Sequence, residues 1–502
     1  LNEQVGGFTT VFDDGYSFDV ASIESNIREG SSWTDAQLQL SVGSGLLKNI
    51  TDTVTTIKTP NVKGNNISLI AGTDIGSFDD ALTIDLEALL TALTIEQKAA
   101  LAAAERGDVT VNGSVLSIMQ ARPVNVTTGA GALTADANGL MLLGSEKDLR
   151  INQVTTAGDI RIKTSGALVN VAAAGVVNVS GQNIILEAAN GGIGSETAPL
   201  LLDAEFGSGV TARAKNDIWM KSLVDFNIDT MYSPNNINID AQGSIFDFQM
   251  TEVQNSEDLN IRGNYVMLTA QNGSIGTTVN ALDVSVNKDG LIQANASTLG
   301  HGVYLNGTQN ENFRVDSITA DNEVVLTSAD DIVLAGGSIT SIKATLSAGT
   351  DGSGSLDVGA EDTGEYAIDT TSTLDMAAAT DITVEGRIRV QGLTNIVSGD
   401  DITLAGGSIY STSNINVDAG SDGSGSINIG QSNPDLNSIE TTEVLSLTAA
   451  DDINVSGNIK AGRSIAFNAA RKTNLTEGTI STLGTVEIAS DDSLTIGTGV
   501  FG

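Results

Sequence analysis

Four pairs of adjacent aspartates are the residues of this chain best suited to acid–base chemistry. Two carboxylates held in one groove can act as general acid and general base on a glycosidic bond. Each pair, however, stands at the same point of a repeating pattern, just before an apolar segment. Periodic placement favours a solvated corner that tolerates aspartate over a single catalytic site. The pairs are Asp330/Asp331, Asp400/Asp401, Asp451/Asp452 and Asp491/Asp492.

The same aspartates raise the question of a metal site. Carboxylate oxygens at turns suit Ca²⁺, which prefers hard oxygen ligands. The segments GTDGSGSLD (349–357) and GSDGSGSIN (420–428) distantly resemble calcium-binding repeats, but the Gly-Gly-x-Gly-x-Asp repeat itself is absent. We therefore assign no catalytic, cofactor-binding or metal-ligating residue. Calcium is the one cofactor that this pattern leaves open, and a solvated turn is the interpretation that the spacing favours.

Histidine and tryptophan offer little more chemistry. His301 is the only histidine, and it lies in Leu-Gly-His-Gly without the G-x-S-x-G motif of a hydrolase. This pattern is typical of a surface loop. Trp33 and Trp219 could stack on sugar rings, but Trp219 in Asp-Ile-Trp-Met is more typical of a residue that covers the end of a strand.

The elements that must position these residues repeat about every 21 positions. From Val444 the chain reads VLSLTAADDINVSGNIKAGRS, then IAFNAARKTNLTEGTIST, then VEIASDDSLTIGTGVFG. Equivalent apolar positions are spaced by 465 − 445 = 20, 475 − 453 = 22 and 480 − 459 = 21. Short alternating segments separated by Gly, Asn and Asp predict one turn of a β-solenoid, because no window carries a helical apolar stripe.

Longer repeats suggest three regions. Residues 1–60 are expected to form degenerate β-solenoid turns. Residues 61–320 are expected to form a β-solenoid with recurring Ile-Gly-Ser/Thr loops at 75–82, 193–200 and 275–282. Residues 321–502 are expected to form a regular β-solenoid in which 328–359 is duplicated at 398–430, an offset of 401 − 331 = 70.

One helical segment interrupts this pattern. Thr94 is a candidate N-cap, alanine-rich residues follow, and Gly107 is placed to end a helix. We therefore expect a short helix near 94–106, within a helical insertion at 86–107, lying on the surface or over one face of the solenoid. The strands are expected to resume at 107–118.

Composition agrees with a repetitive all-β chain. Of 502 residues, 55 are glycine and only 5 are proline, which suits strands that are paired on both sides. The net charge of 24 − 62 = −38 disfavours nucleic acid as a partner, because phosphate recognition requires clustered cations. The absence of cysteine favours a bacterial extracellular protein over a disulfide-stabilised one.

Three patterns carry a resemblance to a known family: NNISLIAGTDIG at 65–76, AANGGIGSETAPL at 188–200, and the repeated (G/D)-D-I-x-(V/L). They resemble the filamentous haemagglutinin-type adhesins, and more narrowly the leukotoxin-type filamentous adhesins, which are two-partner-secreted large exoproteins of Gram-negative bacteria. The resemblance implies an all-β right-handed parallel β-helix (β-solenoid) shaft, an outer-membrane secretion partner and display at the cell surface. The family's N-terminal secretion domain is not recognisable in these residues.

These observations predict a non-enzymatic extracellular structural and adhesive protein, the interior shaft segment of a giant filamentous surface exoprotein. Its expected partners are a host-cell, bacterial or glycan surface receptor. One alternative is a right-handed β-helix glycan-active enzyme or tailspike-like protein, which the scarcity of His, Lys, Arg and aromatic residues disfavours. Another is a subunit of an extracellular fibre that self-associates end to end or laterally.

Overall fold

The structure is a computed structural model. It describes residues 60–85, 109–112, 115–205, 207–248, 259–307, 313–359, 366–430, 437–497 and 500. Two compact units are distinguished: unit 1 comprises Leu1–Gly243 and Asp247–Asn264, and unit 2 comprises Ser244–Phe246 and Tyr265–Gly502. The three expected regions, with boundaries at 60 and 320, stay predictions. The first of them and the helix near 94–106, with its insertion at 86–107, lie outside the described residues.

Both units are parallel β-solenoids, which confirms the predicted fold class. The strands of the solenoid pair in parallel with the strand one turn further along, as Ile382 does with Ile402 and Ile402 with Ile427. The backbone N–H of Ile382 donates to the carbonyl oxygen of Asp401 at 2.9 Å, and that of Ile402 to Ser426 at 2.9 Å. Within the described ranges no residue is helical. Hydrogen bonds therefore run along the stack, from one turn to the next.

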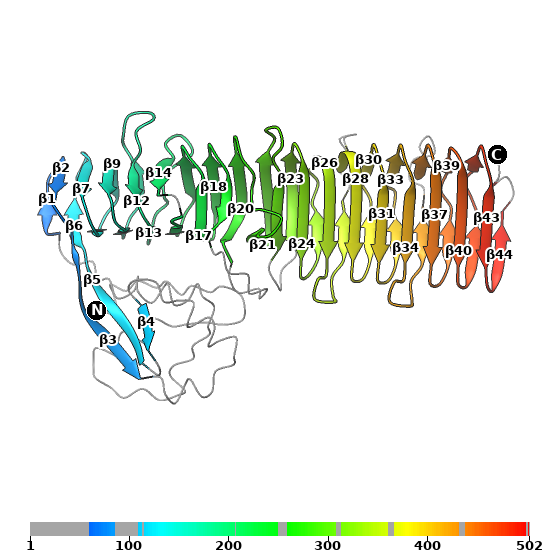
Figure 1. The fold of residues 1–502 in the computed structure, drawn as a ribbon, viewed down its shortest axis with the longest axis horizontal. Helices are drawn as coiled ribbons and strands as arrows, with labels where there is room; N and C mark the ends of the chain where they lie inside the picture. The colour runs from blue at the N-terminus through cyan, green and yellow to red at the C-terminus, as the bar shows by residue number, and fades with distance from the viewer. Residues whose placement is uncertain are drawn as a thin grey trace. The chain divides into compact units, whose positions relative to one another are not determined.

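Unit 2 has three faces, each a column of parallel strands (Figure 1). Face A contains β22 (Val303–Gly307), β24 (Glu323–Ser328), the second halves of β26 (Ile339–Ala348) and β28 (Ile368–Ala378), β31 (Thr394–Ser398), β34 (Ile415–Ala419), β37 (Val444–Ala449), β40 (Ser464–Ala469) and β43 (Val486–Ser490). Face B contains the start of β23 (Phe313–Ala320), β25 (Ile332–Leu334), β27 (Leu356–Val358), β29 (Ile382–Val384), β32 (Ile402–Leu404), β35 (Ile427–Ile429), β38 (Ile453–Val455), β41 (Lys472–Leu475) and β44 (Ser493–Ile496). Face C contains the end of β23, the first halves of β26 and β28, β30 (Arg387–Val390), β33 (Ser408–Ser411), β36 (Ile439–Thr441), β39 (Ile459–Ala461) and β42 (Ile480–Thr482).

Unit 1 carries a comparable column, which we call face D. It contains β1 (Val62–Lys63), β6 (Val124–Thr127), β8 (Met141–Ser145), β10 (Ile160–Thr164), β13 (Ile184–Ala188), β15 (Val210–Ala214) and β17 (Phe226–Tyr232). The other strands of its solenoid are β2 (Ile67–Ile70), β7 (Leu133–Ala137), β9 (Leu149–Thr156), β11 (Leu168–Asn170), β12 (Val179–Gly181), β14 (Leu200–Ala204), β16 (Ile218–Ser222) and β18 (Asn236–Ala241). Two strands have residues in both units, β19 (Ile245–Asp247) and β20 (Ile261–Ala270), and β21 (Leu282–Ala296) belongs to unit 2.

A column of isoleucines shows why these residues stack. Eight isoleucines of face C lie in register one above the other, and none is more than 1% exposed. β-Branched side chains pack well on a pleated surface, and burying each contributes roughly 1.5–3 kcal/mol. The core of unit 2 is thus built of aliphatic columns. The eight are Ile318, Ile339, Ile368, Ile388, Ile409, Ile439, Ile459 and Ile480.

Spacing along this column shows a repeat of three turns. Most turns have about 21 residues, as in 339 − 318 = 21, 388 − 368 = 20 and 409 − 388 = 21. Every third turn is longer, with 368 − 339 = 29 and 439 − 409 = 30. The extra residues include the loops 349–355 and 420–426, in which Gly354 and Gly425 adopt φ of 133° and 150°. The 70-residue duplication is therefore three turns of the solenoid.

Residues 77–122 depart from the expected pattern. The strands expected to resume the solenoid at 107–118 instead form an antiparallel three-stranded sheet, in which β5 (Val115–Arg122) pairs with both β3 (Ser77–Asp85) and β4 (Val109–Asn112). The physical reason is visible in the sequence, because β4 and β5 are separated by only Gly113 and Ser114, and a two-residue Gly-Ser connection favours a hairpin. The solenoid resumes at β6, whose first pairing partners are β1 and β8.

The isoleucines of the three Ile-Gly-Ser/Thr segments take equivalent places in the solenoid, but the chain after the first segment continues differently from the other two. Ile75, Ile193 and Ile275 each form parallel bridges to neighbouring turns. Gly194 and Gly276 have φ of 64° and 66°, and a Cβ on either would lie 2.3 Å from a carbonyl oxygen of the next turn. Only glycine fits such a position. The loops after Gly194 and Gly276 close by hydrogen bonds at 195–198 and 277–280, whereas the chain after Gly76 runs into β3.

Candidate functional site

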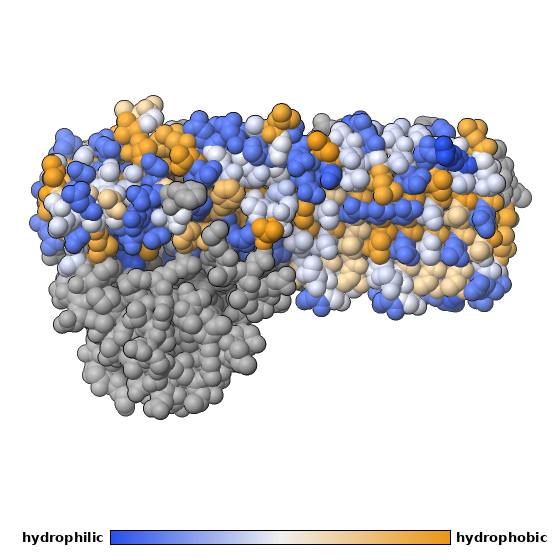
Figure 2. All heavy atoms as spheres, viewed as in Figure 1, coloured by the Kyte–Doolittle hydropathy of each residue, from blue (hydrophilic) through white to orange (hydrophobic). Residues whose placement is uncertain are grey.

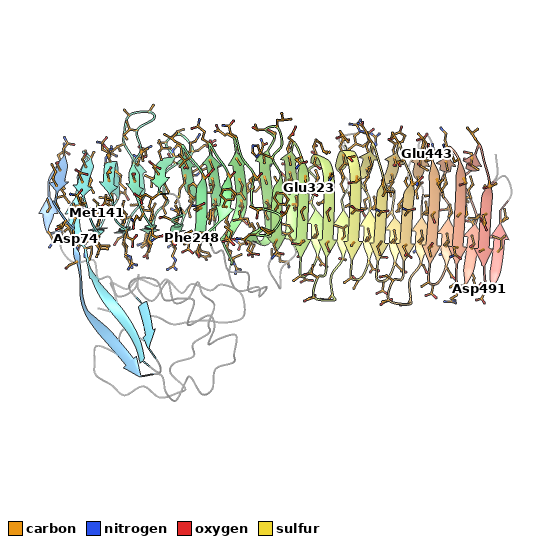
Figure 3. All side chains as sticks on the ribbon, viewed as in Figure 1. Asp74, Met141, Phe248, Glu323, Glu443 and Asp491 are labelled. Atoms are coloured by element: carbon orange, nitrogen blue, oxygen red, sulfur yellow. The ribbon has the colours of Figure 1, made fainter. Side chains whose placement is uncertain are left out.

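The aspartates that introduce face B form the candidate site of unit 2. We call Asp331, Asp381, Asp401 and Asp452 the aspartate edge, because each directly precedes a strand of face B at the corner that follows face A. Asp491, labelled in Figure 3, lies at the same corner after β43. The register therefore brings the predicted aspartate pairs, which are two or three turns apart, onto one edge of the solenoid.

The side chains of this edge accept backbone hydrogen bonds from the next turn. Oδ1 of Asp401 accepts from the N–H of Ser426 at 2.7 Å, and Oδ1 of Asp381 accepts from the N–H of Asp401 at 2.9 Å. Oδ1 of Asp331 accepts both from the N–H and from the hydroxyl of Ser355, at 2.7 and 2.9 Å. A corner breaks the regular ladder, so these carboxylates satisfy N–H groups that the strands leave unpaired.

In two of the pairs the first aspartate has a different partner from the second. Oδ1 of Asp400 accepts from the hydroxyl of Ser424 at 3.3 Å, and Asp451 forms an ion pair with Arg471 at 3.5 Å. The second member of each of these two pairs accepts from a backbone N–H group of the next turn instead. The side chains of both members therefore connect neighbouring turns.

Unit 1 uses the same device. Oδ1 of Asp74 accepts from the N–H of Leu140 at 2.7 Å, and Oδ1 of Asp148 accepts from the N–H of Ala167 at 2.9 Å.

No family model, curated protein or solved structure matches this chain.

Polar ladders run along the faces beside the aspartate edge. On face B, Nδ2 of Asn454 donates to Oδ1 of Asn428 at 2.9 Å, and Nδ2 of Asn474 donates to Oδ1 of Asn454 at 2.8 Å. On face A, Asn416 donates to Asn395 at 2.9 Å. Asparagine suits this role because its amide is both donor and acceptor, so identical residues in register can bond to one another.

Asp357 is the one carboxyl group of face B whose surroundings oppose its charge. It points outward from β27, between Val333 and Thr383 in the register. Burial raises the pKa of Asp357, and the nearby carboxylates of Asp331, Glu385 and Asp381 raise it further. Both effects favour the protonated form in the folded protein. One three-turn repeat later, at 357 + 71 = 428, the chain carries Asn428, the first residue of the asparagine ladder.

Replacing Asp357 by asparagine is therefore expected to stabilise unit 2 at neutral pH. The pKa of the Asp357 carboxyl is higher in the folded than in the unfolded protein, so the ionised carboxylate destabilises the folded state. This destabilisation is absent at pH 3 and develops as the pH rises above the pKa of the unfolded protein. Because the group is only half-buried, the gain at pH 7 should be no more than about 1 kcal/mol. Urea unfolding at pH 7 and at pH 3 measures the change in the free energy of unfolding that the substitution causes. Asp418→Asn, on an exposed residue of face A, is the matched control, and equal or lower stability of Asp357→Asn at pH 7 would contradict the account.

His301 and Trp219 lie in structural contacts. Nδ1 of His301 is 3.3 Å from Oγ of Ser274, whose hydroxyl also accepts from the N–H of Gly302 at 3.2 Å. These contacts tie one turn to the next, as the aspartates do. Trp219 lies in β16, is partly buried, and donates its backbone N–H to the carbonyl of Ile193 at 2.8 Å. Trp33 lies outside the described residues.

No group of three or more His, Cys, Asp or Glu side chains in the described residues is placed to hold a metal ion. In the same residues, no helix has the length and apolar character needed to cross a membrane. The aspartates of the edge are also not present on every turn, because Ser355 and Ser426 stand at the corresponding corners before β27 and β35.

Proposed function

We propose that this chain is a non-enzymatic structural and adhesive protein, a shaft segment of a giant bacterial filamentous surface exoprotein. Its function is mechanical: the stacked turns form a stiff spacer that holds a binding region away from the cell. In a solenoid each turn contacts only its neighbours, so resistance to bending and unfolding depends on the contacts between successive turns. The proposal thus depends on how continuous those contacts are.

The observation that carries the proposal is that all three faces of unit 2 are bonded from turn to turn. The eight-isoleucine column of face C is unbroken in register from Ile318 to Ile480. Face B adds the asparagine ladder, and the corner adds the aspartate edge. Ion pairs one turn apart reinforce the outside of face C, including Lys460 with Glu440 at 2.8 Å. The polar residues are used to connect turns, which suits a spacer.

Location and partners are part of the same proposal. The resemblance to filamentous haemagglutinin-type adhesins supports export through an outer-membrane partner and display on a Gram-negative cell surface. The net charge of −38 and the absence of cysteine support an extracellular protein that does not bind nucleic acid. The receptor that fits an adhesin is a host-cell, bacterial or glycan surface.

The test holds the full chain by its two ends in an optical trap. A spacer should resist extension and then unfold in steps whose lengths are multiples of one turn, about 21 residues at roughly 3.5 Å each. A smooth extension at low force would contradict the mechanical function.

In parallel, the chain is incubated with a panel of polysaccharides and reducing ends are measured. Cleavage above a heat-denatured control would favour the glycan-active alternative and overturn the proposal.

A further inference from the structure

One junction between neighbouring turns of unit 2 differs from the junctions around it. Its lower turn contains β26 and β27, and its upper turn contains β28 and β29. Among the described residues, no side-chain hydrogen bond or ion pair joins these two turns. They are held by the packed core and by the backbone ladder, in which the N–H of Leu356 donates to the carbonyl of Asp381 at 2.9 Å. We call this contact the bare junction.

The other junctions carry side-chain bonds as well as the ladder. Directly below the bare junction, Asp331 accepts two bonds from Ser355, and directly above it Arg389 forms an ion pair with Asp369. Each such bond contributes a modest net stability to the contact between two turns. Between the turns of β37 and β40 four side-chain pairs are present: Lys460 with Glu440, Arg463 with Glu443, Arg471 with Asp451, and Asn474 with Asn454.

The polar row on the outside of face A also ends at the bare junction. In register this row reads Thr345, Asp375, Asn395 and Asn416. Asn395 donates to Asp375 at 2.7 Å, and Asn416 donates to Asn395 at 2.9 Å. Figure 2 shows a hydrophilic stripe over β28, β31 and β34, where the bonded residues lie. The bonded row therefore connects the turns above the junction and does not cross it.

A buried hydroxyl shows the same loss inside the solenoid. Thr370 is fully buried at the end of face C, and its Oγ1 has no hydrogen-bond partner. At equivalent positions of later turns, the hydroxyls of Ser411 and Thr441 donate to the carbonyl oxygens of Gly392 and Ser413, which belong to the turn before. An inward hydroxyl at this corner thus normally bonds two turns together. At the bare junction it does not, and a buried unpaired hydroxyl costs free energy.

The corner of the lower turn explains why Thr370 has no partner. The corresponding carbonyl oxygen is that of Lys343, and it accepts from the hydroxyl of Ser341 in its own turn at 2.6 Å. The register also shifts here, because the lower turn advances by 343 − 341 = 2 residues where the upper turn advances by 373 − 370 = 3. The two corners therefore do not match residue for residue.

Like charges meet across the bare junction on face B. The carboxylate of Asp357 in the lower turn is close enough to those of Asp381 and Glu385 in the upper turn to interact with them. Repulsion between these groups opposes contact between the turns. Three turns later the equivalent contact is attractive, since Asn454 donates to Asn428 at 2.9 Å.

We propose that, among the turns from β24 to β40, the stack opens first at the bare junction. In a solenoid each turn contacts only its neighbours, so local opening begins where the contact between two turns is weakest. The turns on either side stay bonded to their own neighbours and separate as two stacks. If the chain is a spacer, which rests on the proposed function, the bare junction is where it yields to a load.

Thiol reactivity of the native full chain measures this opening. The chain has no cysteine, so Ala348→Cys places one thiol at the bare junction, and Ala449→Cys places one in the same column between bonded turns. Both alanines are 3% exposed, so either thiol reacts only when its turn opens. Each rate is divided by the rate of the same variant in concentrated urea. The thiol at 348 should react at least about tenfold faster than that at 449, and an equal or slower rate would overturn the proposal.

Hydrogen exchange measures the same opening without altering a buried residue. The N–H of Leu356 bonds across the bare junction, and the N–H of Ile427 bonds to the carbonyl of Asp452 at 3.0 Å across a junction that has side-chain bonds. The two positions are equivalent in the duplication, at 427 − 356 = 71. Mass spectrometry of peptides from the native chain should find exchange at Leu356 at least about tenfold faster than at Ile427.

Two disulfides test whether this exchange reports separation of the turns. Ser347→Cys with Ala377→Cys joins outward positions paired across the bare junction, and Thr448→Cys with Asn468→Cys is the matched control in the same row. The first disulfide should slow exchange at Leu356 about tenfold, and the second should leave it unchanged. Equal exchange at Leu356 and Ile427, or exchange at Leu356 that the first disulfide does not slow, would overturn the proposal. No force is applied, so that result would leave the spacer function, which the optical trap tests, intact.

Discussion

Phe467→Ala is expected to lower the free energy of unfolding of unit 2 by about 3–5 kcal/mol. Phe467 is 1% exposed and lies in the core of face A, in register between Leu447 and Ile488. Its removal would leave a cavity that two neighbouring turns share. Those turns cannot close the gap without breaking their own ladders, since the hydrogen bonds along the stack fix the spacing between turns.

Urea unfolding followed by far-ultraviolet circular dichroism measures this loss on the full chain. The matched control is Asn468→Ala, the next residue of the same strand, which points outward and is exposed. The control should change the free energy of unfolding by no more than about 0.5 kcal/mol. Equal effects of the two substitutions would show that Phe467 is not in a packed interior, and the assigned register of β40 would then be wrong.

Asn178→Ala is expected to destabilise unit 1 by about 3 kcal/mol, because it removes several hydrogen bonds from a fully buried amide. Asn178 is fully buried between β11 and β12. Its Oδ1 accepts from the N–H of Leu201 at 2.9 Å, and its Nδ2 donates to Oδ1 of Asn170 at 2.8 Å and to the carbonyl of Asn152 at 3.2 Å. The substitution would leave the N–H of Leu201 buried without a partner.

The fluorescence of Trp219, which lies in unit 1, together with circular dichroism follows this unfolding. Asn190→Ala is the control, since Asn190 is exposed and donates a single bond from Nδ2 to the carbonyl of Ser165 at 3.0 Å. Its effect should stay within about 0.5 kcal/mol. A loss at Asn178 no larger than that at Asn190 would mean that the buried amide is dispensable for the bend between β11 and β12.

The repeating part of the fold was predictable because its signal is local. Apolar residues at Ile382, Ile402 and Ile453 recur with a polar residue before them, and the same spacing places them in one column. The antiparallel sheet at 77–122 was missed, although the Gly-Ser pair at 113–114 is a hairpin signal. Its strands alternate just as solenoid strands do, and periodicity alone does not report which neighbour a strand pairs with.

The chemistry of the aspartates was only half predictable. Their periodic placement correctly indicated corners, but a sequence does not show which backbone N–H faces Asp401, because the donor, Ser426, lies a full turn away. The burial of Arg161 and Arg213 on the outward side of face D was likewise invisible. Alternation predicts which way a residue points, and it does not predict how far that residue is exposed.

The central claim is that each turn lies in register on the one before it, and a pair of engineered cysteines tests this most directly. In the cysteine-free chain, Asn395→Cys with Asn416→Cys joins two positions paired across face A, and neighbouring parallel strands bring their Cα atoms within disulfide range. Asn395→Cys with Asp418→Cys is out of register by two residues and falls beyond that range. The account predicts that mild oxidation closes the first pair and not the second. Closure of the second pair alone, or equal closure of both, would contradict the stacked parallel register.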